Sequence, residues 1–168
     1  MAEKIICVVG PTACGKTKLG VLLAKRYDGE VVSADSMQIY KGMTIGTAAP
    51  TAEEMEGVPH HMIAVADPAE QWSAARYARA AVPIVDDILR RGKRPILVGG
   101  TGLYVRAVTE GFQFSDSKPD PALREELEGK SNEELYAILR EKTGVTLTGG
   151  EENNRHRLMR SVEKALSG

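Results

Sequence analysis

Cysteine and zinc-ligand patterns are scarce in this sequence, which argues against two classes of small protein. There are only two cysteines among 168 residues. Cys7 lies in an apolar run and Cys14 in a glycine-rich turn seven positions later, a placement that argues against a disulfide and fits a reduced cytoplasm. His60 and His61 are adjacent, so in a strand they would face opposite sides and could not bind one metal together. The sequence therefore predicts neither a disulfide-stabilised scaffold nor a zinc-binding module.

Long apolar runs and an excess of one charge are also missing. The run before Gly10 holds five apolar residues, IICVV, too few for a secretory signal or a membrane span. We therefore expect a cytoplasmic protein without a membrane segment. Lysine and arginine number 22 against 23 acidic residues, a net charge of −1. Binding to nucleic acid or membrane would thus depend on local patches.

What the sequence does contain is a phosphate-binding motif near its start. Gly10, Gly15, Lys16 and Thr17 fit the pattern G-x-x-x-x-G-K-[ST]. Glycines let backbone N–H groups crowd around a phosphate chain, while the lysine adds a mobile cation. The threonine hydroxyl suits Mg²⁺, and the helix that begins here directs the positive end of its dipole at the anion. The alternative interpretation is a tight glycine turn without a ligand.

The residues around the motif support phosphate binding. Apolar residues at 5–9 predict a buried strand, and the apolar spacing over 19–27 predicts a helix. A strand before the turn and a helix after it are the context in which this motif binds phosphate. With 168 residues the chain is long enough for one α/β domain. We predict an α/β fold, a P-loop NTPase-like parallel sheet flanked by helices, with a small helical C-terminal segment.

Two further strands are predicted to end beside this loop. Glu30–Ala34 reads as a strand with Asp35 at its carboxyl end, and Ile96–Val98 is followed by a turn of glycines and Thr101. Because ligands bind outside the carboxyl ends of parallel strands, we expect one shared cleft. The alternative for Asp35 is a turn or a helix cap. Residues 36–50 predict a loop draped near the site.

The second part of the chain is predicted to be helical. Helices are expected over 122–128, 132–142 and 154–166. We divide the chain into a P-loop α/β core at 1–112, a helical insertion segment at 113–150, and a helix at 151–168 that returns to the core. Arginines near the start of the last helix oppose its dipole and call for an anionic or carboxylate neighbour. A solvated basic face is the alternative.

Several stretches together resemble one family, the tRNA dimethylallyltransferases. The stretches that carry the resemblance are GPTACGKT from Gly10, SADSMQIYKGMTIGTAAP from Ser33, VPHHMI from Val58 and RPILVGGTGLYVRAV from Arg94, with weaker similarity in DPALREEL from Asp120 and NRHRLMRSVE from Asn154. The resemblance implies transfer of a dimethylallyl group from its diphosphate to the exocyclic amine of the adenosine just 3′ of a tRNA anticodon. It implies that the partners are tRNA and dimethylallyl diphosphate and that the cofactor is Mg²⁺, and we expect a monomer.

The resemblance also assigns roles to residues. Asp35 would be the general base and would act with Lys16 and Thr101 in catalysis, while Thr17 would bind the metal. The diphosphate would be held by Gly10, Pro11, Thr12, Ala13, Cys14, Gly15, Lys16 and Thr17. The tRNA would be contacted by Asp35, Ser36, Met37, Gln38, Thr101, Arg124, Asn154, Arg155, His156, Arg157 and Leu158.

Three other functions stay open at this stage. The same core could prenylate free AMP, ADP or ATP, which needs less RNA-binding surface. A small-molecule kinase is a third hypothesis, since the phosphate loop alone does not tell ATP from an allylic diphosphate. A non-catalytic remnant is the fourth. Family members usually run well past the position of Gly168, so we expect this chain to hold the catalytic core without the family's C-terminal part.

Overall fold

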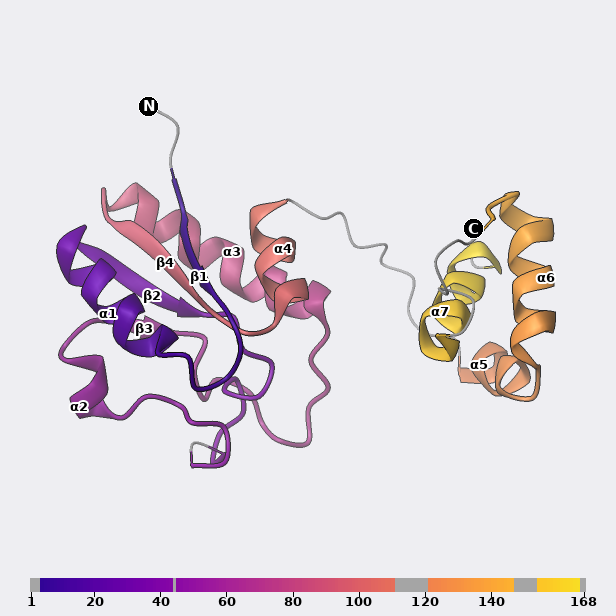
Figure 1. Ribbon diagram of the computed structural model, residues 1–168, viewed down its shortest axis with the longest axis horizontal. Coiled ribbons are helices and arrows are strands. Elements are labelled where there is room, and N and C mark those ends of the chain that lie inside the picture. Colours follow the sequence, from indigo (N-terminus) through magenta and orange to yellow (C-terminus); the bar gives the residue numbers. More distant parts are fainter. Residues whose placement is uncertain (1–3, 44, 111–120, 147–153, 167–168) are drawn as a thin grey trace. The chain divides into compact units, whose positions relative to one another are not determined.

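The computed structural model describes residues 4–43, 45–110, 121–146 and 154–166. It divides into two compact units, Met1–Phe114 and Ser115–Gly168, each of which is described by itself. The first unit is α/β and the second is helical, as the sequence predicts (Figure 1). Among the described residues, no helix is both long and apolar enough to cross a bilayer.

A parallel sheet forms the centre of the first unit. Its strands are β1 (Ile6–Val9), β2 (Gly29–Ser33), β3 (His60–His61) and β4 (Arg94–Gly99), in the spatial order β1-β4-β2-β3. Every pairing is parallel, so the carboxyl ends of the strands meet at one edge of the sheet. Parallel strands are normally covered on both faces, and two apolar clusters cover this sheet.

Helices supply the two clusters. On one face, α1 (Lys16–Arg26) packs Val21 and Ala24 against Val8, Ile96 and other strand residues. On the other face, α3 (Ala74–Arg90) and α4 (Gly102–Thr109) cover β2 and β4, and the Tyr77 and Tyr104 rings stack with centroids 4.0 Å apart. Tyr77 also donates its hydroxyl hydrogen to the carbonyl of Ser33, 2.8 Å away, which fixes the carboxyl end of β2.

Strand β1 is less buried than its apolar sequence predicts. Cys7 is exposed and 60% of Val9 is exposed, although Val8 is buried. The prediction of a buried strand was therefore wrong for one face of β1. The reason is its position: β1 is the outermost strand of the sheet, and within the described residues only β4 pairs with it.

The helical unit has its own small core. It contains α5 (Pro121–Glu128), α6 (Asn132–Thr143) and α7 (Arg155–Leu166). That the last helix returns to the α/β core stays a prediction. The apolar side of α7 is buried among side chains of α5 and α6, in a cluster of Leu127, Leu135, Leu139, Leu158, Met159 and Val162.

A buried carboxylate anchors the sheet at the edge where the strands begin. Glu30 in β2 is 3% exposed, and its oxygens accept hydrogen bonds from Arg91 at 2.5 and 2.9 Å and lie 2.8 Å from His61 Nε2. The hydrogen bonds from Arg91, followed by that from His61, hold the pKa of Glu30 down at about 2. Glu30 therefore ties the C-terminal end of α3 to strands β2 and β3.

We expect Glu30→Gln to lower the free energy of unfolding by about 1.5–3 kcal/mol at pH 6, because the buried side chain loses its charge-assisted hydrogen bonds with Arg91. A carboxylate whose pKa is depressed on folding stabilises the fold above its unfolded pKa and loses that contribution as pH falls toward 2. The difference between the two proteins should thus shrink as the pH falls. Urea unfolding followed by the fluorescence of Trp72, the single tryptophan, measures this difference in the free energy of unfolding.

Glu110→Gln, which breaks an exposed pair with Arg106, is the matched control and should change the free energy of unfolding little. A constant difference at every pH would contradict this account.

Candidate functional site

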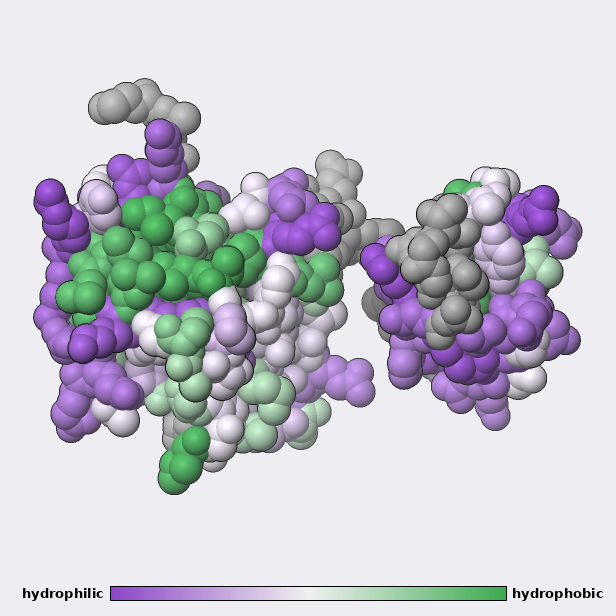
Figure 2. All heavy atoms as spheres, in the orientation of Figure 1, coloured by the Kyte–Doolittle hydropathy of each residue, from purple (hydrophilic) through white to green (hydrophobic). Residues whose placement is uncertain are grey.

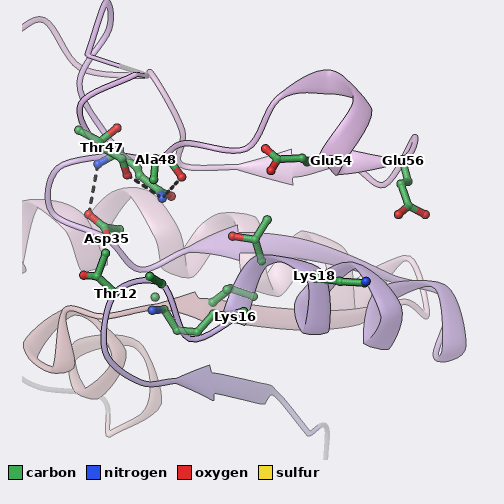
Figure 3. Close-up of a pocket in the computed structure, with 14 residues that line it drawn as sticks. Thr12, Lys16, Lys18, Asp35, Thr47, Ala48, Glu54 and Glu56 are labelled. Carbon is green, nitrogen blue, oxygen red and sulfur yellow. Dashed lines mark hydrogen bonds between the residues drawn. The ribbon is translucent and has the colours of Figure 1, made fainter.

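A cavity of about 450 Å³ opens at the carboxyl ends of the strands, where the predicted phosphate loop meets the ends of β2 and β4 (Figure 3). Its volume falls within the usual range for small-molecule sites, about 300–1,000 Å³. The lining contains seven of the site residues predicted from the sequence, namely Thr12, Ala13, Gly15, Lys16, Thr17, Asp35 and Gln38.

The phosphate loop has the backbone that its glycines predict. Gly15 adopts φ +84°, a left-handed conformation that glycine tolerates without strain, and α1 begins at the next residue. No side chain caps the start of α1, so its first N–H groups are available to an anion. Lys16 Nζ donates to the Pro11 carbonyl at 2.6 Å and lies 4.0 Å from Cys14 Sγ. The loop thus combines backbone donors with an ammonium group at the cavity wall.

Asp35 sits immediately after β2 and is held by its own turn. Its Oδ1 accepts hydrogen bonds from the backbone N–H groups of Met37 at 2.8 Å and Gln38 at 3.3 Å. The turn interpretation is confirmed by these bonds. The same carboxylate also lines the cavity, and its functional role stays a prediction. Within the part of the chain that the structure describes, both of these bonds go to Oδ1, and Oδ2 is the oxygen left for a ligand.

Gln38 links the end of β2 to the loop that contains Thr47 and Ala48. Its Oε1 accepts from Ser33 Oγ at 3.0 Å, while its Nε2 donates to the carbonyls of Thr47 and Ala48 at 3.3 and 3.2 Å. The loop predicted to drape near the site therefore does so, at Thr47 and Ala48, which line the cavity. Met37 projects outward and is 48% exposed.

Thr101 does not line the cavity but lies against Ser36, the residue after Asp35. Its Oγ1 accepts from the Ser36 N–H at 2.9 Å and donates to Ser36 Oγ at 3.3 Å. Its own N–H donates to the Ala34 carbonyl at 3.1 Å. Thr101 precedes α4 but makes no side-chain cap to it, because the hydroxyl is engaged by Ser36. The residue therefore positions the turn that carries Asp35.

Gly99 makes this close approach of β4 to β2 feasible. A Cβ built on Gly99 would lie 2.1 Å from the carbonyl oxygen of Ala34, far inside any permitted contact. A glycine is required at this point because the backbone after β2 passes directly over it. Gly99 therefore permits close packing of β4 against the backbone after β2, and it also lines the cavity.

We expect Thr101→Val to cost about 1–3 kcal/mol of stability, because the half-buried Ser36 N–H loses its acceptor. The Ser36 amide should exchange faster with solvent, and hydrogen exchange measured residue by residue would detect this. Thr101→Ser keeps the hydroxyl and is the control that should retain protection of that amide. Equal protection in the valine and serine variants would show that the hydroxyl does not hold the turn.

The far wall of the cavity was not predicted. Glu54 and Glu56 line it from α2 (Ala52–Met55) and the residue that follows, and Lys18 lines it from α1. Glu56 forms an ion pair with Lys25 of α1, which holds the short helix beside the phosphate loop. Both partners are about half exposed. Two cations of α1 and three carboxylates therefore face one cavity, as Figure 3 shows for the residues that it labels.

Oxygen donors in this cavity fit a hard divalent cation that arrives with a phosphate. The Thr17 hydroxyl and the Asp35 carboxylate both line it. Among the described residues, no cluster of three or more histidine, cysteine or acidic side chains could hold a metal alone. Mg²⁺ typically takes one or two protein oxygens and completes its octahedron with phosphate oxygens and water. The donor set agrees with that mode of binding.

The remaining predicted site residues lie in the helical unit. Arg124 of α5 pairs with Glu128 and Glu163 at 4.0 and 3.9 Å. Arg155 donates to the carbonyls of Glu128 and Lys130, so it closes the C-terminal end of α5.

The residues around Arg155 differ in what they can offer a ligand. Asn154 Oδ1 accepts from the Arg157 N–H at 3.1 Å, a helix cap, and His156 is exposed. Leu158 is 1% exposed in the helical core, so its side chain has no surface to offer an RNA. Its assignment as a tRNA contact is therefore wrong for the side chain, since the apolar packing of α7 buries it.

Comparison with known proteins gives consistent matches. The family model described as IPP transferase matches residues 38–167, and the one described as isopentenyl transferase matches residues 3–71. A curated tRNA dimethylallyltransferase of Halalkalibacterium halodurans is 48% identical over 167 residues, which is 97% of this chain and 53% of the relative. One from Anoxybacillus flavithermus is 44% identical over 163 residues, 97% of this chain and 52% of the relative.

Solved structures agree with the curated relatives. A full-length tRNA isopentenylpyrophosphate transferase from Bacillus halodurans is similar with a TM-score of 0.67 and 46% identity, over 96% of this chain and 55% of its own. A eukaryotic dimethylallyltransferase acting on tRNA has a TM-score of 0.79 at 31% identity, over 96% of this chain and 41% of its own. The chain thus spans about half the length of the curated relatives that it matches.

Proposed function

Since this chain belongs to the IPP transferase family, we propose that it carries out the dimethylallyl transfer for which its relatives are named. The donor is dimethylallyl diphosphate, and the acceptor is the N6 amine of the adenosine just 3′ of a tRNA anticodon. The observation that carries the proposal is the cavity itself, which brings the phosphate loop and Asp35 together. A diphosphate leaving group explains why a phosphate loop serves a reaction that transfers no phosphate.

In the proposed reaction, the phosphate loop binds the leaving group. The N–H groups at the start of α1 point at the diphosphate, and Lys16 turns from the Pro11 carbonyl to its oxygens. The allylic C–O bond breaks as negative charge develops on the diphosphate, and these fixed donors stabilise that charge.

Asp35 acts on the acceptor. The bond from the allylic carbon to N6 forms as the C–O bond breaks, and the nitrogen must then lose a proton. Asp35 Oδ2 accepts it, while Oδ1 stays bonded to the Met37 and Gln38 N–H groups and keeps the carboxylate oriented. An aromatic amine is a weak nucleophile, so a base within hydrogen-bond reach accelerates the step.

Mg²⁺ is the proposed cofactor. The Thr17 hydroxyl would hold it together with diphosphate oxygens, and Asp35 lies in the same cavity. When bound, the ion neutralises part of the diphosphate charge.

The acceptor has a second candidate, a free adenine nucleotide. Two residues that were predicted to contact tRNA are engaged within the helical unit, which favours this candidate. Arg155 is bonded to carbonyls at the end of α5, and Leu158 is buried. A free adenine nucleotide is also compatible with a cavity of about 450 Å³. We place tRNA first because it is the substrate in the names of the relatives.

We propose the cytoplasm as the location and a monomer as the active form. The absence of a disulfide among the described residues supports the first, since both Cys7 and Cys14 are free. Light scattering at the concentration of the assay would test the second.

The deciding experiment incubates the chain with Mg²⁺ and radiolabelled dimethylallyl diphosphate, with tRNA in one tube and AMP or ATP in another. Label in tRNA is the expected result, and label only in the nucleotide would move the acceptor to the second candidate. A parallel tube with labelled ATP and no prenyl donor tests phosphoryl transfer. Donor binding without label in either acceptor would refute the proposed activity for this chain.

A further inference from the structure

The far wall of the cavity is the part of the site to which the proposed reaction gives no task. Lys18 lines it from α1, and Glu54 and Glu56 line it from α2 and the residue that follows. In Figure 3, Lys16 lies between Asp35 on one side and these three residues on the other. The donor carries its reacting carbon at one end and a free phosphate at the other. With the carbon at Asp35, the free phosphate is directed past Lys16 toward the far wall.

The first turn of α1 carries positive charge that an anion would balance. Lys16 and Lys18 both lie in it, and it contains no acidic residue. Cations near the N-terminus of a helix oppose its dipole, so both lysines gain from a bound anion. Glu56 is paired with Lys25, one helix end away, rather than with Lys18. Lys18 therefore offers the cavity a second ammonium group on the side to which the free phosphate is directed.

The short helix α2 is kept beside the cavity although it adds nothing to the apolar core. None of its residues is buried, and Figure 2 shows a hydrophilic surface over it, in contrast to the hydrophobic surface over β1 and α1. Its position depends on the capping box of Thr51 and Glu54 and on the ion pair between Lys25 and Glu56. Polar contacts thus hold two carboxylates at the cavity wall, which indicates a task for them there.

The two carboxylates differ in how their charge is balanced. Glu56 has the ammonium group of Lys25 as its partner. Glu54 Oε2 accepts from the backbone N–H of Thr51 at 2.9 Å, a neutral donor that fixes the side chain without cancelling its charge. A ligand that extends beyond the two lysines of α1 would bring a further phosphate toward this negative charge. Such a repulsive element is a common device for excluding a competing ligand.

We propose, building on the proposed function, that the far wall sets the length of the phosphate chain that the site accepts. Lys18 binds the terminal phosphate of a diphosphate, and Glu54 opposes a third phosphate. The site is thereby selective for diphosphates over triphosphates. This selectivity separates an allylic diphosphate from ATP, a distinction that the phosphate loop alone does not make.

Calorimetric titrations with inorganic phosphate, diphosphate and triphosphate test the proposal. The three probes are compared at one Mg²⁺ concentration and one salt concentration, because charge interactions at an open cavity are screened by salt. We expect the tightest binding for diphosphate. Triphosphate that binds as tightly as diphosphate, or more tightly, would overturn the proposal.

Variants of Lys18 test the contact with the second phosphate. Lys18→Ala should lower the ratio of diphosphate to phosphate affinity about 10-fold, because only the longer ligand reaches this ammonium group. Lys18→Arg keeps the charge and should recover most of the ratio. Lys4→Ala is the control, since Lys4 is exposed and precedes β1, at the edge where the strands begin. A ratio that Lys18→Ala leaves unchanged would refute the contact.

Glu54→Gln tests the exclusion of a third phosphate. It should raise the ratio of triphosphate to diphosphate affinity about 10-fold, because the opposing charge is lost. Glutamine also fits a capping box, so α2 should persist. Glu53→Gln removes a charge from the same helix outside the cavity lining and should leave the ratio unchanged. A lower triphosphate affinity in Glu54→Gln would mean that the carboxylate aids the longer ligand, and the proposal would be wrong.

These titrations use no transfer of label, so they separate chain-length selection from the proposed activity. A chain that prefers diphosphate but transfers no label would refute the activity and leave the selection in place. A chain that binds none of the three probes would refute both.

Discussion

Replacing Lys16 by alanine is expected to lower the affinity of the chain for inorganic diphosphate about 100-fold, which corresponds to about 3 kcal/mol. Lys16 opens α1, lines the cavity and in the free protein donates to the Pro11 carbonyl. Its ammonium group can leave this neutral carbonyl for a phosphate oxygen at little cost, so the lost interaction is a charge-assisted one.

Calorimetric titration with diphosphate and Mg²⁺ measures the effect. Lys142→Ala is the control. It removes the same charge, but Lys142 lies in the last turn of α6, in the helical unit. If that variant weakens binding as much as Lys16→Ala, a general loss of positive charge rather than the loop explains the result. Unchanged affinity in Lys16→Ala would refute the phosphate site.

The backbone of the phosphate loop could be predicted from the sequence because its geometry is local. The loop is a run of neighbouring residues whose glycines permit the backbone seen at Gly15, and the strand and helix around it follow from apolar spacing. Two helix starts have the same local character. Thr51 with Glu54 and Ser131 with Glu134 both form reciprocal capping boxes, in which all the groups involved lie within three residues.

The far wall of the cavity could not be predicted, because its position depends on contacts between distant residues. Glu56 reaches the site through an ion pair with Lys25, which is 31 residues away in the chain. No pattern in the sequence marks either residue as part of a site, since exposed Lys and Glu are common on any surface.

Thr101 illustrates a different difficulty. A polar residue in a glycine-rich turn after a buried strand was correctly placed near the site, yet its side chain is directed to Ser36 rather than into the cavity. Whether such a hydroxyl contacts a ligand or supports another residue depends on rotations that a sequence pattern does not encode. The same holds for Arg155, whose charge serves the carbonyls at the end of α5.

Asp35→Asn is expected to slow prenyl transfer about 1,000-fold while leaving the affinity for the donor nearly unchanged. The substitution is informative because this side chain both holds its own turn and, in the proposed reaction, accepts a proton. An amide oxygen can still accept the hydrogen bonds from Met37 and Gln38 that Oδ1 accepts now, so the turn should persist. An amide cannot take up the proton of the acceptor amine, so only the chemical step should suffer.

Comparison with Asp35→Ala separates the two tasks. Alanine removes the acceptor for both N–H groups as well as the base, so it should also lower stability, by about 1–2 kcal/mol, as loss of a side-chain acceptor at a turn or cap does. Single-turnover transfer of label measures the rate, and urea unfolding measures the stability. Asp86→Asn, on the exposed side of α3, is the matched control and should change neither. Full turnover by the asparagine variant would mean that the carboxylate only shapes the turn and that the proton leaves by another route.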